Sequence, residues 1–209
     1  MPNYKIEPNS ALLIIDAQQE YSNSNRPLFT SDFNETVLNI NKISQACRQQ
    51  KIPVFIVKHL LDRSGRNAGR MADFISEQVF IDGEQYAESD SSVVVDESDI
   101  VIEKTRYSAF INTNLEAYLK SLGINTVLVT GFMTGYCSVT TARHAHDLDY
   151  QVIYINDANS GPTFGNLGFG EVSVEDIKRV VATLLAGGVA EVIDTNEAIN
   201  RITKAQVSV

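Results

Sequence analysis

The sequence predicts one α/β domain: a three-layer α/β/α sandwich on a mainly parallel, Rossmann-like sheet of about six strands. Short apolar runs alternate along the chain with longer segments of helical spacing. Alternation of this kind gives a parallel sheet with helices on both faces. The 209 residues contain no Pro- or Ser-rich linker and no internal repeat, so we expect a single domain over residues 1–209.

The expected strands are short apolar runs. The first, 11–15, contains no polar residue and is typical of a strand buried on both faces. The full set is 11–15, 53–57, 100–103, 125–131, 151–155 and 189–193.

The expected helices have apolar residues every three or four positions, and glycines follow two of them. Gly123 and the pair at 187–188 are typical of helix ends. Between the regular elements, 60–98 and 161–170 are irregular, and such long connections often line active sites or subunit contacts. The expected helices are 34–50, 113–122, 136–148 and 173–186.

Composition narrows the class of protein. The net charge is −9, from 17 basic and 26 acidic residues without a Lys/Arg cluster, which argues against a nucleic-acid partner. No apolar run is long enough to cross a bilayer, and the N-terminus lacks a signal-peptide pattern. Two cysteines are too few for a disulfide scaffold. We therefore expect a reduced, cytoplasmic protein without a membrane partner.

Reactive side chains follow the ends of several predicted strands. Asp16 follows the first strand, Lys104 the third, and Cys137 lies just after the fourth, where the next helix begins. Ligands of open parallel sheets bind at the carboxyl ends of the strands. We therefore expect an acid, a lysine and a cysteine to meet at one edge of the sheet.

This set of side chains suits nucleophilic catalysis. A cysteine attacks as the thiolate, which a helix N-terminus and the Lys104 ammonium would both stabilise, so we expect a lowered thiol pKa for Cys137. Asp16 can accept the thiol proton and later deliver it to a leaving nitrogen. Taken alone, Cys137 fits a core residue equally well.

Three segments carry a family resemblance: ALLIIDAQ at 11–18, VIEKTRYSAF at 101–110, and VTGFMTGYCSVTTAR at 129–143. Together they resemble the isochorismatase-like cysteine hydrolase family, which includes nicotinamidases and N-carbamoylsarcosine amidohydrolase. The resemblance implies that Asp16, Lys104 and Cys137 form a catalytic triad. It also implies a cis peptide bond between Phe132 and Met133, and an oxyanion hole made by the N–H groups of Met133 and Cys137.

The metal site of the family's nicotinamidases is incomplete in this sequence. Those enzymes bind a metal through an Asp-x-His pair and a second histidine just after strand two, where this chain has only His59. His144 and His146 are two residues apart on a predicted helix and point about 200° apart. We expect no metal and no other cofactor, which makes nicotinamide a less favoured substrate.

Five residues are candidates for substrate contact, each with a structural alternative. Gln18 and Tyr21 either line the pocket or begin a surface helix, and Phe110 either walls the pocket or belongs to the core. His59 either touches substrate or is a satisfied buried polar group, and Thr134 is expected to position the oxyanion loop.

Three other residues are expected to be structural. Cys47 lies on the apolar face of the first predicted helix. Arg106 is expected in a surface ion pair rather than bound to a substrate carboxylate. Asp157 is expected to cap a helix or turn.

The favoured function is hydrolysis of a C–N bond in a small amide, carbamoyl compound or ureide through a thioester on Cys137. Isochorismatases cleave a vinyl ether and often lack this cysteine, so that alternative is weaker. A non-catalytic binding protein and a thiol redox sensor are the others, and no resolving cysteine is visible for the latter. The resemblance also implies a homodimer or homotetramer.

Overall fold

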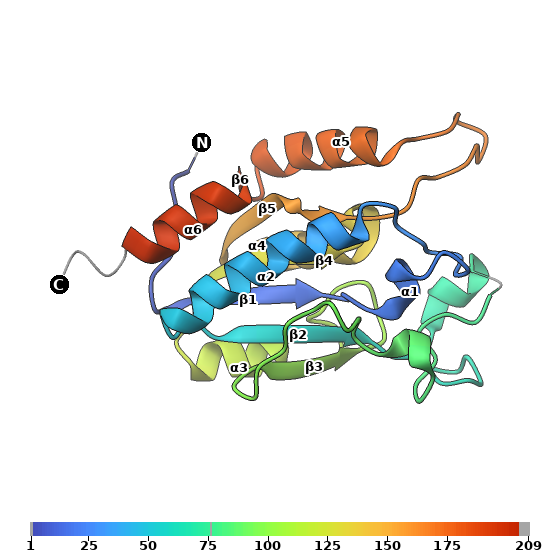
Figure 1. The fold of residues 1–209 in the computed structure, drawn as a ribbon, viewed down its shortest axis with the longest axis horizontal. Helices are drawn as coiled ribbons and strands as arrows, with labels where there is room; N and C mark the ends of the chain where they lie inside the picture. Colours follow the sequence, from blue (N-terminus) through green and yellow to red (C-terminus); the bar gives the residue numbers. More distant parts are fainter. Residues whose placement is uncertain (1, 76, 205–209) are drawn as a thin grey trace.

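The computed structural model describes residues 2–75 and 77–204, and its centre is one six-stranded parallel sheet between two layers of helices (Figure 1). The sheet order is β3-β2-β1-β4-β5-β6, and every neighbouring pair is parallel. The predicted fold class is therefore confirmed. The strands are β1 (Ser10–Ile15), β2 (Val54–His59), β3 (Ile100–Lys104), β4 (Thr126–Phe132), β5 (Gln151–Ser160) and β6 (Glu191–Ile193).

The strand order reverses between β1 and β4, and this reversal positions the site. In an open parallel sheet the crevice at such a switch point is where ligands bind. The strands end nearly level there, because Ile15 lies opposite both Val57 and Gly131, and His59 lies opposite Lys104. Residues at or just after these strand ends therefore share one edge.

Two helices cover one face of the sheet and three cover the other. One core cluster joins α2 and α6 to one face, and a second joins α3, α4 and α5 to the opposite face. The α-helices are α1 (Gln19–Ser22), α2 (Phe33–Gln49), α3 (Leu115–Ser121), α4 (Val139–Asp147), α5 (Val174–Ala186) and α6 (Thr195–Lys204). Shorter turns are the 3₁₀ helices η1 (Gly69–Asp73) and η2 (Gln85–Ala87) and the π-helix η3 (Thr134–Ser138).

The last helix, α6, was not predicted from the sequence. Its buried face is small, with Ala198 and Ile202 packed in the α2 core. Asp194 directly precedes it, and the Asp194 carboxylate accepts a hydrogen bond from the Glu197 N–H at 2.8 Å, the usual geometry of an N-cap. Asp194, three residues before Glu197, was therefore the sequence feature that could have indicated this helix start. Strand β5 also runs to Ser160, five residues beyond its predicted end.

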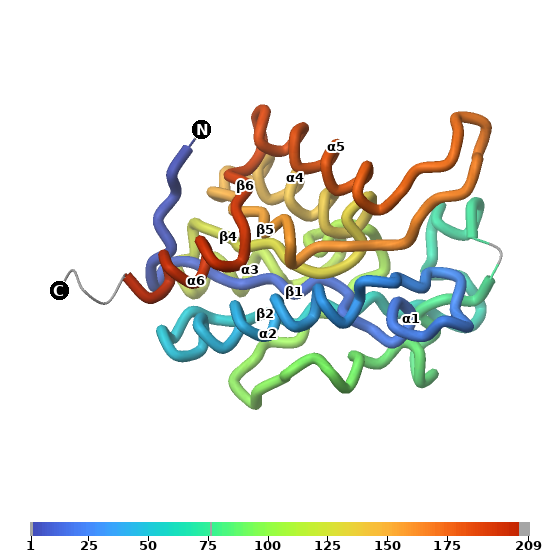
Figure 2. The backbone as a smooth tube through the Cα atoms, turned by 45° about the horizontal axis from the view of Figure 1, so that its top comes forward, coloured from blue at the N-terminus to red at the C-terminus, as the bar shows by residue number. Residues whose placement is uncertain are grey.

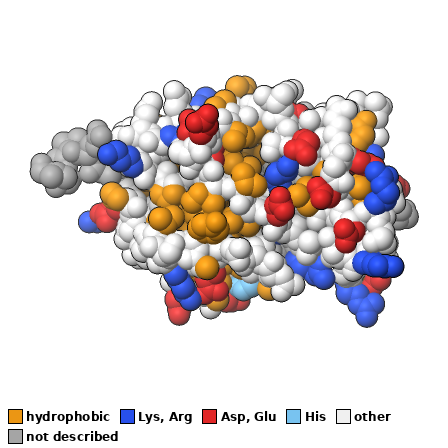
Figure 3. Space-filling view, turned by 90° about the horizontal axis from the view of Figure 1, so that it is seen from below, with side chains coloured by type: hydrophobic (Ala, Val, Ile, Leu, Met, Phe, Trp, Pro, Cys, Tyr) orange, Lys and Arg blue, Asp and Glu red, His pale blue; other side chains and the backbone are white. Residues whose placement is uncertain are grey.

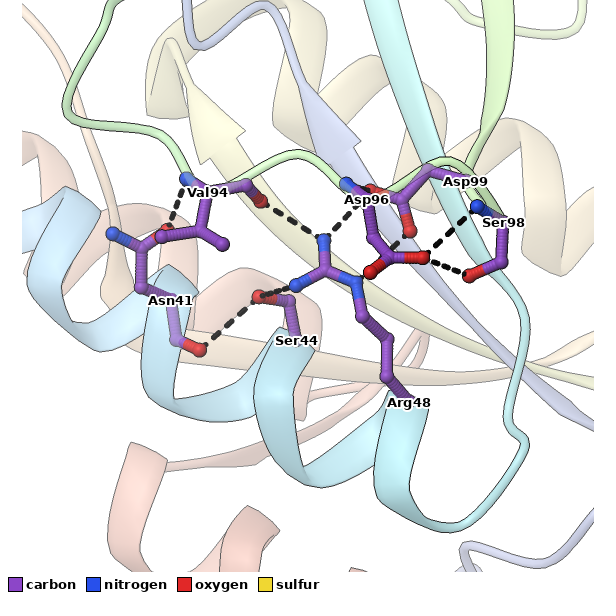
Figure 4. A network of polar contacts seen from close by, with 7 residues as sticks. All are labelled: Asn41, Ser44, Arg48, Val94, Asp96, Ser98 and Asp99. Carbon is purple, nitrogen blue, oxygen red and sulfur yellow. Dashed lines mark hydrogen bonds and ion pairs between the residues drawn. The ribbon is translucent and has the colours of Figure 1, made fainter.

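Polar contacts hold the long segment between β2 and β3 against α2. Arg48 on α2 makes a two-pronged ion pair with Asp99, at 3.0 and 2.7 Å, and also donates to the Val94 carbonyl (Figure 4). Asn41 of the same helix accepts a hydrogen bond from the Val94 N–H at 2.9 Å. Because Asp99 directly precedes β3, this network fixes the strand that carries Lys104.

The two irregular segments lie at the same end of the molecule. Figures 1 and 2 show the 60–90 region and the loop before α5 extending beyond the carboxyl ends of the strands. The loop narrows where Phe164 and Val172 exchange two backbone hydrogen bonds, at 3.1 and 2.9 Å. Both irregular segments therefore extend past the edge of the sheet at which the strands end.

Apolar side chains gather on the face of the molecule that carries β3 and α3, seen from below in Figure 3. Val101 on β3, Tyr118 on α3 and Leu122 just after α3 are all exposed. Among the described residues, no helix has the length and apolar character needed to cross a membrane.

We predict that Gly131→Ala disrupts the sheet at the switch point. A Cβ on Gly131, whose φ is +113°, would collide with the backbone of Ile15 on β1. We expect a loss of about 3 kcal/mol in the free energy of unfolding. Gly123→Ala is the matched control: its φ is also positive but its Cβ would meet open space, so about 1 kcal/mol is expected. Equal losses in denaturant titration would contradict this packing argument.

Candidate active site

Asp16 is positioned by the end of β1 and by an unusual backbone conformation. Its N–H continues the sheet by donating to the Val57 carbonyl at 2.9 Å, and its φ of +48° then turns the chain away. A non-glycine residue with positive φ is uncommon and such residues concentrate at functional sites. The carboxylate is fully buried beside the switch point.

Lys104 connects the acid and the thiol. Its Nζ lies 2.7 Å from Asp16 Oδ2 and 3.3 Å from Cys137 Sγ. Both side chains of the ion pair are fully buried. The three residues predicted to form a triad are therefore brought together, although they come from strand ends about 90 and 120 positions apart in the numbering.

The Lys104 ammonium has two further partners. It donates to the Arg106 carbonyl at 3.0 Å, and its Nζ lies 3.2 Å from His59 Nδ1. Because an ammonium cannot accept a hydrogen bond, Nδ1 must be the acceptor and the imidazole proton is on Nε2. Burial, followed by the charges of Lys104 and Arg106, holds the pKa of His59 well below its usual value. His59 is therefore neutral.

Cys137 lies in the π-helical turn η3, between β4 and α4. The Met133 carbonyl accepts hydrogen bonds from the N–H groups of Tyr136, at 3.0 Å, and Ser138, at 3.3 Å. These bonds pass over the Cys137 N–H, the usual donor to that carbonyl in an α-helix. The peptide bond between Phe132 and Met133 is cis. The turn thus differs from the regular helix start expected from the sequence.

Burial dominates the ionisation of the acid and the lysine. It raises the pKa of Asp16, and the Lys104 charge opposes this only in part. Burial would lower the pKa of Lys104, but Asp16 and Cys137 outweigh it, so the pKa lies above its ordinary value. Lys104 therefore stays protonated across the physiological range.

The pKa of the Cys137 thiol is raised, whereas the sequence had led us to expect a lowered pKa. Burial raises the pKa of Cys137 to about 12; Lys104 lowers it, but Asp16 raises it further. The carboxylate and the thiolate are both negative and share one ammonium, so the site holds only one of them as an anion. The raised pKa of Cys137 therefore keeps the thiol neutral at rest, while Lys104 pairs with the Asp16 carboxyl group.

A cavity of about 420 Å³ opens onto the Cys137 side chain. Its wall consists mainly of aromatic and aliphatic side chains from the sheet edge, from α1 and the loop after it, and from both irregular segments. The lining residues are Tyr21, Leu28, His59, Met71, Phe74, Ile75, Phe80, Tyr107, Met133, Tyr136, Cys137, Phe164 and Leu167. The buried thiol of Cys137 therefore faces a largely apolar space.

Comparison with known proteins decides the family. The family model described as the isochorismatase domain matches residues 10–197. The chain belongs to the isochorismatase family. Nicotinamidase 3 of Arabidopsis thaliana is 31% identical over 197 residues, covering 87% of this chain and 93% of that protein. A second Arabidopsis thaliana protein, a probable inactive nicotinamidase, is 34% identical over 161 residues, covering 74% and 82%.

Solved structures agree with this assignment. A cysteine hydrolase from Pseudomonas syringae pv. phaseolicola superposes with a TM-score of 0.94 at 30% identity, covering 98% of this chain and 99% of that one. The resemblance stated from the three sequence segments is therefore confirmed. The protein is an isochorismatase-family hydrolase.

A metal does not fit the donor set of this isochorismatase-family site. Asp16, His59 and Cys137 have donor atoms within 4.8 Å of one another, a spacing that suits a metal ion. However, Lys104 Nζ contacts Asp16 and Cys137 and also His59 Nδ1, so the ammonium supplies the positive charge there. A dication in the same space would meet that ammonium at contact distance.

Two of the five candidate substrate contacts line the cavity, Tyr21 and His59. Gln18 does not: its amide donates to the carbonyls of His59 and Ala87 and accepts from the His59 N–H, so it braces the end of β2. It is buried rather than at a helix surface.

Phe110 and Thr134 also lie outside the cavity. Phe110 packs in the core, with its ring centroid 5.2 Å from that of His144 and 6.0 Å from that of Tyr150. Thr134 is buried under the turn and borders a separate small pocket with Gly161. Neither side chain borders the cavity above Cys137.

The remaining candidates have structural surroundings. Cys47 is buried in the α2 core. Asp157 accepts hydrogen bonds from the N–H and hydroxyl of Thr195, both at 2.8 Å, at the start of α6. Arg106 makes no ion pair with a described residue; it donates to the carbonyl of Thr105, at 2.6 Å, and to that of Asn67.

Sequence reasoning missed most of the cavity wall. Tyr107 and Tyr136 lie inside segments 101–110 and 129–143, which carry the family resemblance. They could have been predicted from their closeness in sequence to Lys104 and Cys137. The other missed residues come from irregular segments, where no periodicity shows which side chains turn inward. They are Leu28, Met71, Phe74, Ile75, Phe80, Phe164 and Leu167.

We predict that Asp16→Asn makes Cys137 more reactive while abolishing its catalytic use. Without the Asp16 charge, Lys104 stabilises the thiolate alone, so the pKa of Cys137 falls. At pH 7 we expect carbamidomethylation of Cys137 by iodoacetamide to be at least roughly tenfold faster.

Peptide mass spectrometry measures both cysteines in each sample, and Cys47 is the internal control because burial holds its pKa at about 12. Unchanged or slower labelling of Cys137 in Asp16→Asn would show that the carboxylate does not keep the thiol neutral.

Proposed function

We propose that this protein is a cysteine hydrolase that cleaves a C–N bond of a small amide, carbamoyl compound or ureide. The observation that carries the proposal is the contact of Lys104 with both Cys137 Sγ and the Asp16 carboxylate, at the base of a cavity that admits a small molecule. The similarity to a nicotinamidase supports amide chemistry.

In the first half-reaction, Asp16 accepts the thiol proton and Cys137 Sγ attacks the carbonyl carbon. The ammonium of Lys104, 3.3 Å from Sγ, stabilises the thiolate as it forms. The N–H groups of Met133 and Cys137 are the proposed oxyanion hole, and the bonding pattern of the turn, which passes over Cys137, supports that role.

The first half-reaction ends when the protonated Asp16 gives its proton to the nitrogen as the C–N bond breaks, and ammonia or an amine leaves. In the second half-reaction, a water molecule attacks the thioester and transfers one proton to Asp16. That proton returns to sulfur when the carboxylic acid is released, so the resting thiol is restored. No step requires a cofactor.

The test is a screen of small amides, carbamoyl compounds and ureides that follows ammonia release. We expect Cys137→Ala to reduce kcat by at least about 10³-fold on any substrate found. Cys47→Ala is the matched control and should retain activity, because Cys47 is buried in the α2 core away from the cavity. Intact-mass spectrometry should also detect an acyl adduct on Cys137. Equal activity in Cys137→Ala would refute the mechanism.

A second candidate is a binding protein without catalysis, since one similar protein is a probable inactive nicotinamidase. The screen separates the two functions: ligand binding without ammonia release or acyl adduct in the intact protein would favour the binding role. The complete set of Asp16, Lys104 and Cys137 favours catalysis.

We also propose that the protein works in the reducing cytoplasm as a homodimer or homotetramer. Both cysteines are free, which supports a reduced setting. The exposed apolar group of Val101, Tyr118 and Leu122 at the β3 edge supports self-association. Light scattering after size exclusion should give a multiple of the 23.1 kDa chain mass, and a monomer mass would contradict assembly.

A further inference from the structure

The cavity above Cys137 has an aromatic and aliphatic wall. The His59 ring stacks on Phe80 with centroids 4.8 Å apart. On another part of the wall, the Tyr136 ring lies 5.1 Å from that of Tyr107 and 5.8 Å from that of Phe164. Among the described lining residues, none is Asp, Glu, Lys or Arg. The polar groups on this wall are neutral.

Two cations beside the lining residues, Lys104 and Arg106, are held by other groups. Lys104 is 1% exposed, pairs with Asp16, and does not border the cavity. The Arg106 guanidinium donates to the carbonyls of Asn67 and Thr105, and it packs so closely under Gly69 that a Cβ there would lie 2.7 Å from its Cζ. Neither side chain can reach a ligand without losing these contacts.

The neutral wall gives the cavity a preference for uncharged ligands. A carboxylate that enters loses water and meets no counter-charge, whereas an apolar group gains from burial. His59 cannot supply the charge, because burial and the neighbouring cations hold its pKa well below its usual value. The volume of about 420 Å³ falls within the range of roughly 300–1,000 Å³ that holds drug-sized ligands.

We propose that this cavity selects uncharged amides with a bulky apolar acyl group and discriminates against amides whose acyl group carries a carboxylate. This choice of substrate class rests on the proposed function, but the binding preference can be measured without turnover. The two claims can therefore fail separately.

Calorimetric binding to Cys137→Ala tests the preference with two probes that differ only at one substituent. 4-Methylbenzamide has a methyl group where 4-carbamoylbenzoate has a carboxylate. We expect the neutral amide to bind at least roughly tenfold more tightly. Equal or tighter binding of 4-carbamoylbenzoate, or no binding of 4-methylbenzamide, would overturn the proposal.

A positive charge placed at the mouth of the cavity tests whether the lack of a counter-charge causes the preference for neutral amides. Phe74 lines the mouth and is 85% exposed, so Phe74→Arg should be tolerated. In the Cys137→Ala background it should improve the affinity for 4-carbamoylbenzoate by roughly tenfold and leave 4-methylbenzamide unchanged. Phe169→Arg is the matched control, since Phe169 is 97% exposed on the neighbouring loop but does not line the cavity. An equal gain in both variants would contradict a local effect.

Turnover by the wild-type protein then separates the two claims. Tighter binding of the neutral amide without ammonia release from any amide supports the cavity preference and refutes the proposed hydrolase. Faster hydrolysis of 4-carbamoylbenzoate than of 4-methylbenzamide supports the hydrolase and refutes the preference.

Discussion

The buried ion pair between Asp16 and Lys104 is the interaction on which the rest of the site depends. Both side chains are fully buried, and removing two charges from water costs several kcal/mol per ion unless each keeps good partners. Lys104 keeps Asp16, the Arg106 carbonyl and His59 Nδ1. Those partners come from three strand ends, so the pair forms only when the strands pair in their observed order. Gly131 contributes because it lets β4 approach β1 closely.

The same pair determines the resting state of the thiol. One ammonium lies between a carboxylate and a thiol, and the carboxylate takes the negative charge, which leaves Cys137 protonated. A neutral thiol suits a cavity with an apolar wall, because no isolated anion then faces that space. In the proposed mechanism, the thiol proton moves to Asp16 as sulfur attacks the substrate carbonyl.

Much of the fold and the central set of residues could be predicted from the sequence, because both follow from alternation and from strand ends. Continuous apolar runs such as 11–15 mark buried strands, and parallel strands bring Asp16, Lys104 and Cys137 to one edge. Helix α6 escaped prediction because its apolar face is short. The raised pKa of Cys137 escaped because it depends on burial and on the competition for Lys104, which spacing cannot show. Sequence spacing does not show which way the side chains of Gln18 and Phe110 point. Much of the cavity wall comes from loops, where no periodicity shows which side chains turn inward.

Infrared spectroscopy of the resting protein at pH 7 shows whether the proton shared by Cys137 and Asp16 lies on sulfur or on the carboxylate. In a Cys47→Ala background the S–H stretching band reports Cys137 alone, and the difference from Asp16→Asn identifies the Asp16 carboxyl bands. We expect an S–H band together with the bands of an ionised Asp16 carboxylate. Absence of the S–H band, with the carbonyl band of a protonated Asp16, would show that the proton has already moved from sulfur to Asp16 and would refute a neutral resting thiol.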